Sequence, residues 1–258
     1  MLTLLASAGA IVGRDDLPAD AYVVPDADWP ALVDLIEPGD CIGTLIEPSF
    51  LLTVAHSAVD VREGRTFDVA GVQAVAAAVF VHPDWRDRDV HDVALVRLEA
   101  PITHVEPVPL GDAQVTVGDV VGIVGRGISA TGLEGEDGGV TDGRLRRATN
   151  VVTAVGDASF AVLFDPPGPT ATDLEGVGAA GDSGGPVFRD GTLVGLNSFG
   201  DDEGGGVATY GSHDHQVHLA TYVPWIRDVL AGRVEPSRPR RGCAHGVPWS
   251  GLGLLARR

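Results

Sequence analysis

The chain has 258 residues, of which 35 are glycine and 17 are proline, and its formal net charge at pH 7 is −18. This length is enough for one large domain or two modest ones with a sizeable buried core. The acidic balance argues against nucleic acid as a partner, because phosphate binding needs a positive surface, and no apolar run is long enough to predict a membrane-spanning helix.

Residues 1–10 form the first distinct segment, an apolar stretch that ends in Ala8-Gly9-Ala10 as a secretory signal does. The segment has no basic residue at its start and is shorter than a typical signal peptide. We therefore interpret it as a signal or propeptide remnant, and we expect the protein to be secreted. The sequence Ile11-Val12-Gly13-Arg14 follows it directly.

Short valine-rich runs separated by glycine and proline predict strands and turns through most of the chain. Strands are expected at 41–46, 49–54, 65–70, 72–82, 93–98, 119–125, 145–155 and 159–164. A proline- and glycine-rich linker is expected at 107–118, and a surface loop without a core-forming pattern at 129–143. A helix is predicted from Thr221, which can cap it, to Gly232, because apolar residues recur there at three- and four-residue steps.

Three polar residues in separate segments suggest a shared chemical role. The turn Gly181-Asp182-Ser183-Gly184-Gly185-Pro186 holds one hydroxyl among glycines that allow tight backbone conformations. A serine is a poor nucleophile unless a base removes its proton. His56 ends an apolar run with an imidazole, and Asp92 begins another with a carboxylate. Taken singly, each of these residues is typical of an ordinary turn or strand end.

The sequence resembles the trypsin/chymotrypsin-like serine protease family, and within it a bacterial-type member. The resemblance is carried by the order His56, Asp92, Ser183 and by the motifs Ala55-His56, Asp92-Val93-Ala94-Leu95 and the glycine-rich serine turn. The resemblance implies an all-β fold of two antiparallel six-stranded β-barrels with a C-terminal helix. The expected divisions are as follows: a signal or pro remnant at 1–10, the N-terminal barrel at 11–117, the C-terminal barrel with its helix at 118–232, and an arginine-rich tail at 233–258.

The resemblance implies a serine endopeptidase, a hydrolase that works through an acyl-enzyme. Ser183 would attack the peptide carbonyl, His56 would act as general base and then general acid, and Asp92 would orient the imidazole. The backbone N–H groups of Gly181 and Ser183 would form the oxyanion hole. No cofactor is expected, the partner is a protein or peptide substrate, and we expect a monomer.

Ile11 resembles the mature N-terminus of the family, whose amino group pairs with the aspartate before the catalytic serine, here Asp182. A buried carboxylate at Asp182 needs such a partner, because an unpaired buried charge is costly. Ala10 precedes Ile11 where zymogens carry Arg or Lys, so signal-type cleavage could release this terminus directly. The alternative is that Ile11 is a strand residue in an unprocessed arm, and Arg14 in place of a glycine departs from the family pattern.

Substrate specificity follows less directly from the resemblance. Ser198-Phe199-Gly200 falls where the family has a Ser-Trp-Gly substrate-binding strand, and the Ser198 hydroxyl is expected to reach Asp92. Val177 falls at the pocket-floor position, which predicts a small or apolar residue at P1, the substrate residue before the cleaved bond. Asp214, at a position where the family usually has a pocket glycine, is the rival floor and would favour a basic P1.

The two cysteines, Cys41 and Cys243, could form one bridge or remain free thiols. In the family a cysteine at Cys41 pairs with one just after the catalytic histidine, and Ser57 stands there instead. That bridge is therefore absent, and the turn that holds His56 is expected to be fixed by packing alone. An inactive homologue that binds partners through its groove, and an esterase that uses the same triad, remain the alternative functions.

A cluster of histidines near the C-terminal end of the sequence raises the question of a metal site. His213 and His215 alternate on a predicted strand, which puts them on one face, and Asp214 and His218 are close in sequence. Strand-edge histidines without cysteines more often have no ligand, so no metal site is expected. Asp201-Asp202-Glu203 is expected to be a solvated loop rather than a calcium site.

Overall fold

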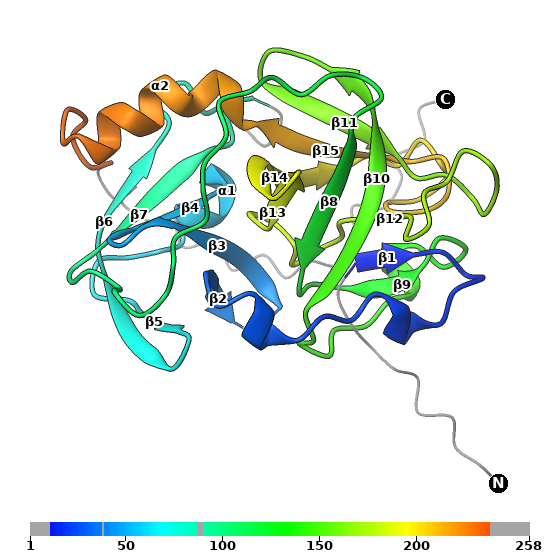
Figure 1. Ribbon diagram of the computed structural model, residues 1–258, viewed down its shortest axis with the longest axis horizontal. Helices are drawn as coiled ribbons and strands as arrows, with labels where there is room; N and C mark the ends of the chain where they lie inside the picture. The colour runs from blue at the N-terminus through cyan, green and yellow to red at the C-terminus, as the bar shows by residue number, and fades with distance from the viewer. Residues whose placement is uncertain (1–10, 38, 87–89, 238–258) are drawn as a thin grey trace, which may run out of the picture.

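The computed structural model describes residues 11–37, 39–86 and 90–237. Two six-stranded antiparallel sheets, formed from the two halves of the sequence, lie side by side along the long axis of the molecule (Figure 1). The N-terminal sheet consists of β2 (Leu32–Glu37), β3 (Asp40–Glu47), β4 (Phe50–Thr53), β5 (Thr66–Val69), β6 (Val72–Val81) and β7 (Ala94–Leu98). The C-terminal sheet consists of β8 (Val120–Gly125), β10 (Arg146–Val155), β11 (Ser159–Leu163), β13 (Pro186–Arg189), β14 (Thr192–Gly200) and β15 (His213–His218).

Both sheets curve into barrels. The C-terminal sheet is closed, in the order β10-β11-β15-β14-β13-β8. The N-terminal sheet has the order β2-β3-β4-β7-β6-β5 and is nearly closed, because its edge strands β2 and β5 are in contact. Alternate residues of β6 are buried and partly exposed, as expected of a strand with one face on a barrel core. The predicted all-β fold of two six-stranded barrels is confirmed.

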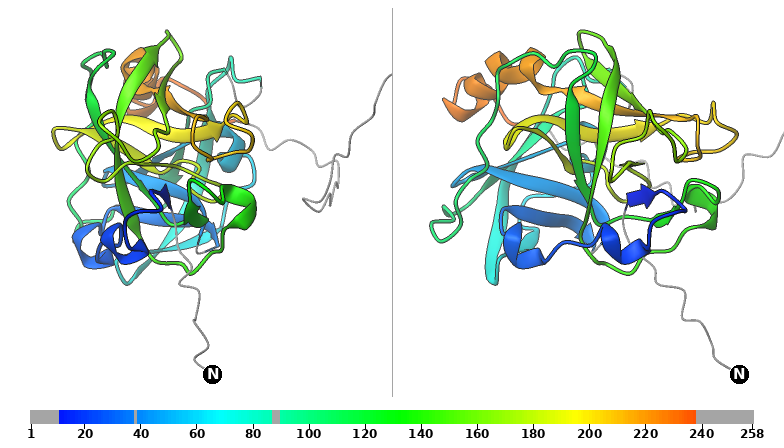
Figure 2. Two further views of the ribbon diagram at one scale, coloured as in Figure 1. Left: turned by 90° about the vertical axis from the view of Figure 1, so that its right-hand side faces the viewer. Right: turned by 45° about the vertical axis from the view of Figure 1, so that its right-hand side comes forward.

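A small third sheet was not predicted from the sequence. Its strands are β12 (Gly176–Val177), β1 (Ile11–Gly13) and β9 (Ser129–Thr131), with β1 in the middle, antiparallel to β12 and parallel to β9 (Figure 2). The interpretation of 129–143 as a loop is therefore wrong in part, since β9 and the 3-10 helix η3 (Glu136–Gly138) lie within it. Two further 3-10 helices, η1 (Ala19–Ala21) and η2 (Asp26–Asp28), follow β1.

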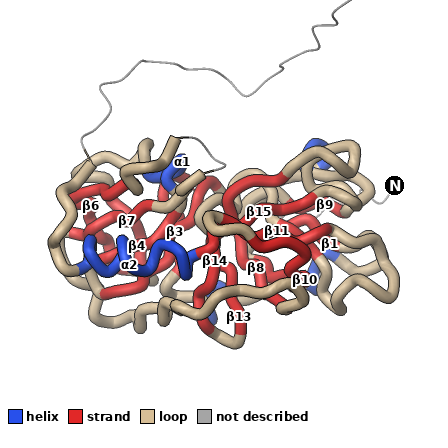
Figure 3. Tube along the Cα trace, turned by 90° about the horizontal axis from the view of Figure 1, so that it is seen from above, coloured by secondary structure: helices blue, strands red, loops and turns tan. Residues whose placement is uncertain are grey.

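The C-terminal helix α2 (Leu219–Leu230) begins two residues before the predicted start, directly after β15. Thr221 is not its cap: the N-cap is His218, and the Thr221 hydroxyl instead donates to the carbonyl of Asp157. Although α2 follows the C-terminal barrel in sequence, it lies over the N-terminal half of the molecule (Figures 1 and 3). Its buried face shares one apolar cluster with both barrels, which includes Leu95 of the N-terminal barrel and Leu196 of the C-terminal barrel.

Candidate active site

The pairing of β4 with β7 brings an imidazole and a carboxylate together. In this antiparallel pair Thr53 lies opposite Ala94. His56 lies three residues beyond Thr53, in the one-turn helix α1 (Ala55–Ala58), and Asp92 lies two residues before Ala94. Because the strands run in opposite directions, the residue that leaves one and the residue that enters the other meet at the same end of the barrel.

His56 contacts the other two residues of the predicted triad through its two ring nitrogens. Its Nδ1 lies 2.7 Å from Asp92 Oδ2, and its Nε2 lies 2.9 Å from Ser183 Oγ. Both distances are normal for hydrogen bonds. The structure therefore brings together three residues that are up to 127 positions apart in the sequence.

Asp92 is almost fully buried, with 3% of its surface exposed, and both of its carboxylate oxygens accept hydrogen bonds. The backbone N–H of His56 donates to Oδ1 at 2.9 Å, and the Ser198 hydroxyl donates to Oδ2 at 2.7 Å. The contact predicted for Ser198 is thus present. These donors fix the carboxylate so that Oδ2 faces the imidazole, which favours the tautomer with the proton on Nδ1.

His91 positions the backbone at Asp92. It has a φ of +57°, in the left-handed region that a residue with a Cβ seldom adopts. Its ring stacks on that of His82 with 5.0 Å between ring centroids, and its Nδ1 lies 3.2 Å from the hydroxyl of Tyr222 in α2. Helix α2 therefore packs directly against the segment that carries the buried carboxylate.

Ser183 lies in the loop between β12 of the small third sheet and β13 of the C-terminal barrel. Main-chain hydrogen bonds hold this loop against the N-terminal barrel. The N–H of Ile42 donates to the Ser183 carbonyl at 2.8 Å, and the N–H of Cys41 donates to the Gly181 carbonyl at 3.1 Å. Within the part of the chain that the structure describes, no acceptor is assigned to the N–H groups of Gly181 and Ser183. Neither N–H group is therefore engaged by the described part of the chain.

Two glycines of this loop are required by its geometry. Gly181 and Gly184 have φ values of +93° and +80°. A Cβ on Gly181 would lie 2.1 Å from the carbonyl oxygen of Gly39, and one on Gly184 would lie 2.2 Å from that of Ile42. The neighbouring atoms belong to the backbone and cannot move aside easily, so a side chain at either position would force the barrels apart locally.

Asp182 is 1% exposed, and the backbone donors around its carboxylate include Ile11 in β1. Its carboxylate accepts hydrogen bonds from the backbone N–H of Gly127 at 2.7 Å and of Ala179 at 3.0 Å. The backbone N–H of Ile11 is a further donor to it. Burial raises the pKa of Asp182 to about 6, and these donors oppose the rise. The structure thus brings together the predicted pair of Ile11 and Asp182, with Ile11 itself 1% exposed.

The sequence suggested that packing alone fixes the turn that holds His56, but a side-chain hydrogen bond also holds it. The Ser57 hydroxyl donates to the Cys41 thiol at 2.8 Å, so a hydrogen bond stands where the family's disulfide would be. Cys41 is buried as a free thiol, and burial raises its pKa to about 12. Cys243 and the arginine-rich tail from residue 238 lie outside the described residues, as does the signal-like segment 1–10.

The two candidate pocket-floor residues lie close together but differ in environment. Val177 packs in the apolar core of the C-terminal barrel. Asp214 is 4% exposed, and its Oδ2 accepts a hydrogen bond at 2.8 Å from the N–H of Gly178, the residue after Val177. Burial raises the pKa of Asp214 to about 7, and the Gly178 amide, which stabilises the anion, opposes the rise.

Asn197 also belongs to this polar region, and sequence reasoning missed it. A Cβ on Gly178 would lie 3.2 Å from both Asn197 Oδ1 and Asp214 Oδ2, so the two oxygens face the same space. Asn197 is 3% exposed, and its Oδ1 has no hydrogen-bond partner among the described residues. Its position next to Ser198, in the predicted substrate-binding strand, was the only feature of the sequence we considered that could have indicated it.

The predicted substrate strand Ser198-Phe199-Gly200 ends β14 and lies beside β15. The Phe199 ring stacks on the ring of His215, with 4.5 Å between centroids and an interplanar angle of 8°. Gly200 lies opposite Asp214 in the strand pair. The histidine grouping considered from sequence divides, because His218 is buried and contacts Val115 N and Gly156 O through its ring nitrogens.

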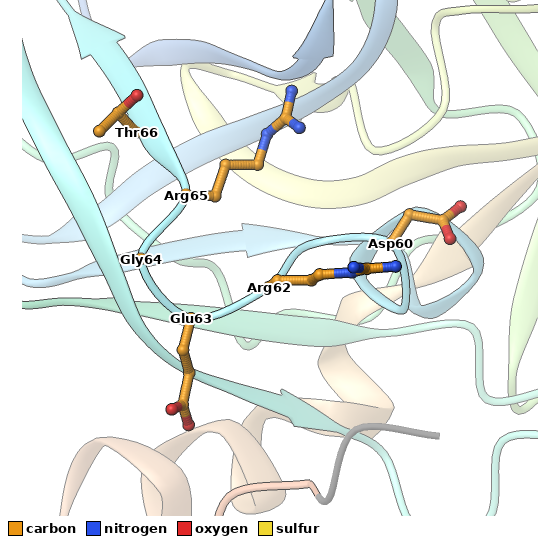
Figure 4. A pocket seen from close by; sticks show the side chains of 6 residues that line it. All are labelled: Asp60, Arg62, Glu63, Gly64, Arg65 and Thr66. Carbon is orange, nitrogen blue, oxygen red and sulfur yellow. The ribbon is translucent and has the colours of Figure 1, made fainter. Parts of the chain in front are cut away.

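A separate surface hollow follows α1 and contains none of these residues. It is lined by Asp60, Arg62, Glu63, Gly64, Arg65 and Thr66. Its charged side chains do not converge: Arg65 and Glu63 point in opposite directions (Figure 4). Arg65 is already engaged through its guanidinium with the carbonyl of Ile36. The hollow therefore offers no set of groups aimed at one ligand.

Comparisons with known proteins agree with this geometry. A family model described as Trypsin matches residues 21–226. A snake venom serine proteinase of Crotalus adamanteus is 27% identical over 218 residues, which cover 77% of this chain and 81% of that protein. A trypsin of Saccharopolyspora erythraea is 29% identical, with 67% and 82% covered. A brachyurin of Leptuca pugilator is 28% identical, with 72% and 86% covered.

Proposed function

Because this chain belongs to the trypsin family of serine proteases, and is therefore a serine-type endopeptidase, we propose that Ser183, His56 and Asp92 are its catalytic residues. The observation that carries the proposal is one unbroken chain of hydrogen bonds. It runs from Ser198 to Asp92 at 2.7 Å, from Asp92 to His56 at 2.7 Å, and from His56 to Ser183 at 2.9 Å.

The reaction follows from these contacts. Ser183 Oγ forms a bond to the carbonyl carbon of the scissile peptide while its proton passes to His56 Nε2. The imidazolium then gives that proton to the leaving amine as the carbon–nitrogen bond breaks, which leaves an acyl-enzyme. Water, deprotonated by the same nitrogen, releases the second product and restores Ser183. Asp92 stabilises the imidazolium in both steps.

The N–H groups of Gly181 and Ser183 complete the proposed machinery as the oxyanion hole. Their availability supports this role, and so does the φ of +93° at Gly181, which turns the peptide plane in a way that other residues resist. Removing one oxyanion-hole donor typically costs about 3–4 kcal/mol of transition-state stabilisation. The geometry of this loop should therefore matter as much as the triad itself.

Cleavage before Ile11 would complete the site by supplying a cation to Asp182. A free amino group at Ile11 would form an ion pair with a carboxylate that otherwise has only amide partners. We therefore extend the proposal to an activation pair of Ile11 and Asp182. N-terminal sequencing of the active form should find Ile11, and a different first residue in a fully active enzyme would contradict it.

For the P1 side chain, a basic residue is now favoured over the small or apolar one that Val177 suggested. Asp214 and Asn197 present two buried oxygens to the same space, and no residue that the structure describes donates to Asn197 Oδ1. An arginine or lysine brings donors and a positive charge, which offset the cost of burying the carboxylate. A panel of peptides that differ only at P1 tests this choice, and equal cleavage of Arg and Ala substrates would reject it.

The substrates are proposed to be extracellular proteins or peptides, cleaved by a monomeric enzyme. Among the described residues, no helix has the length and apolar character needed to cross a membrane. One of the relatives is described as a snake venom serine proteinase. Mass analysis of culture medium against cell extract tests the location, and light scattering tests the monomer.

The triad is tested with Ser183→Ala and a matched serine, Ser49→Ala, in the turn between β3 and β4. Ser183→Ala should lower kcat on a peptide substrate by about a million-fold and abolish labelling by a fluorophosphonate probe, because the triad acts as a unit. Ser49→Ala should retain both. Failure of the probe to label Ser183 in the wild type would indicate an inactive homologue, and cleavage of an ester but not its matched peptide would indicate an esterase.

A further inference from the structure

Four side chains of the types that bind metal ions, from Asp201, Glu203, His213 and His215, lie close together where β14 ends and β15 begins. His213 and His215 project on the same side of β15, because alternate residues of a strand share a face. Asp201 follows the last residue of β14, and its backbone N–H donates to the His213 carbonyl at 2.9 Å, which continues the ladder. Glu203 comes two residues later in the same loop.

The donor atoms of these side chains are separated as the ligands of one ion would be. His213 Nδ1 lies 3.2 Å from Asp201 Oδ2 and 3.6 Å from Glu203 Oε2. His215 Nε2 lies 3.6 Å from the same Asp201 oxygen. A tetrahedral ion with metal–ligand distances of about 2.0–2.1 Å places its ligand atoms about 3.3 Å apart. The group Asp201, Glu203 and His213 alone fits within a span of 4.8 Å.

The carboxylate of Asp201 is oriented before any ligand arrives. Its Oδ1 accepts hydrogen bonds from the backbone N–H of His213 at 2.8 Å and of Glu203 at 3.2 Å. That leaves Oδ2 directed at the two imidazoles. The side chains of His213, His215 and Asp201 are 31%, 27% and 23% exposed, so the atoms are held by the fold and still open to solvent.

We propose that Asp201, Glu203, His213 and His215 bind a divalent transition-metal ion of the Zn²⁺ class. Two carboxylates and two neutral imidazoles balance a charge of +2. Mixed nitrogen and oxygen ligands suit Zn²⁺, Cu²⁺ and Ni²⁺, whereas Ca²⁺ and Mg²⁺ take oxygen ligands and would leave the imidazoles unused. The four residues are distinct from the triad and lie at the end of the β14–β15 pair beside Phe199, whose ring stacks on His215.

Zinc titration of the full chain, stripped with EDTA and followed by calorimetry, tests the proposal. Zn²⁺ should bind at one ion per chain, and Glu203→Gln and His213→Gln should each weaken binding by at least about tenfold. Asp202→Asn removes an exposed carboxylate of the same loop that lies outside the donor set, and it should bind as the wild type does. His104→Gln, which removes an imidazole elsewhere on the N-terminal barrel, should do the same.

Three results would overturn the site. They are an absence of zinc binding in the wild type, equal affinity in the wild type, Glu203→Gln and His213→Gln, and loss of binding in His56→Gln alone, which would place the ion on the catalytic imidazole. Glu203 is 71% exposed, so its replacement should leave the fold intact. Circular dichroism of each variant verifies this, and binding is read without reference to proteolysis.

Discussion

Asp214→Asn separates what a buried carboxylate contributes to specificity from what it costs in stability. The substitution keeps the size of the side chain and an oxygen that can accept from the Gly178 amide, but it removes the charge. Burial raises the pKa of Asp214 to about 7 from its ordinary value of 3.8. That difference corresponds to about 4 kcal/mol of unfavourable free energy when the folded protein carries the anion.

The sign of the pH dependence follows from the two pKa values. Below 3.8 the carboxyl is protonated in both the folded and the unfolded chain and favours neither state. Between 3.8 and about 7 the unfolded chain loses its proton first, so the wild type loses stability as pH rises. Asparagine does not titrate. We therefore expect Asp214→Asn to be more stable than the wild type at pH 8 by up to about 4 kcal/mol, with the difference vanishing near pH 4.

Urea unfolding at pH 4, 6 and 8 measures this difference, with both proteins in a Ser183→Ala background so that self-cleavage does not interfere. Asp202→Asn, an exposed carboxylate, serves as the control and should show no such trend. In the active enzyme, Asp214→Asn should lower kcat/KM for arginine at P1 by about 30-fold to several thousand-fold and leave alanine at P1 nearly unchanged. A stability difference that does not vary with pH, or an unchanged arginine preference, would refute the reasoning.

Three further predictions rest on single contacts. Ser198→Ala removes the 2.7 Å donor to Asp92 and should lower kcat by about 10- to 100-fold with little change in KM, as steady-state kinetics would show. Gly184→Ala should destabilise by more than about 3 kcal/mol in urea, whereas Gly191→Ala, at φ +76° but in open space, should cost only about 1–2 kcal/mol. Cys41, buried with a pKa raised to about 12, should resist iodoacetamide at pH 8 until the protein unfolds, as peptide mapping would reveal.

The sequence predicted most strands of both barrels, although not β2 or β13, because the apolar patterns of the others reflect burial that each strand experiences locally. Thus 72–82 was expected where β6 runs from Val72 to Val81, and 145–155 where β10 runs from Arg146 to Val155. The sheet of β12, β1 and β9 could not be predicted in this way. Its strands have two or three residues, too few for a period, and exist through pairing between remote segments.

The residues of the candidate site differ in the same way, because some are marked by local motifs and others depend on pairing between remote segments. The residues of the predicted triad stand in motifs at strand ends, so the sequence could name three residues that the structure brings within hydrogen-bond distance of one another. The polar region of Asn197 and Asp214 depended on the register of β14 against β15, which shifts between Asn197 and Phe199. The grouping of Asp201 with His213 likewise depends on where β14 ends. A pattern of residue types does not encode such a shift, so Asp214 could not be ranked above Val177 from sequence.

The catalytic arrangement depends on the packing of the two barrels because each proposed catalytic residue is tied to both. The Ser183 carbonyl accepts a hydrogen bond from the backbone N–H of Ile42 in β3. The backbone N–H of the next residue, Gly184, donates to the Asn197 carbonyl in β14 at 2.8 Å. The residue after Asn197, Ser198, reaches back to Asp92 of the N-terminal barrel. A small displacement between the barrels would therefore break several of these bonds together. The apolar cluster that α2 shares with Leu95 and Leu196 opposes that displacement, so the helix farthest along the sequence helps to hold the distances on which proton transfer depends.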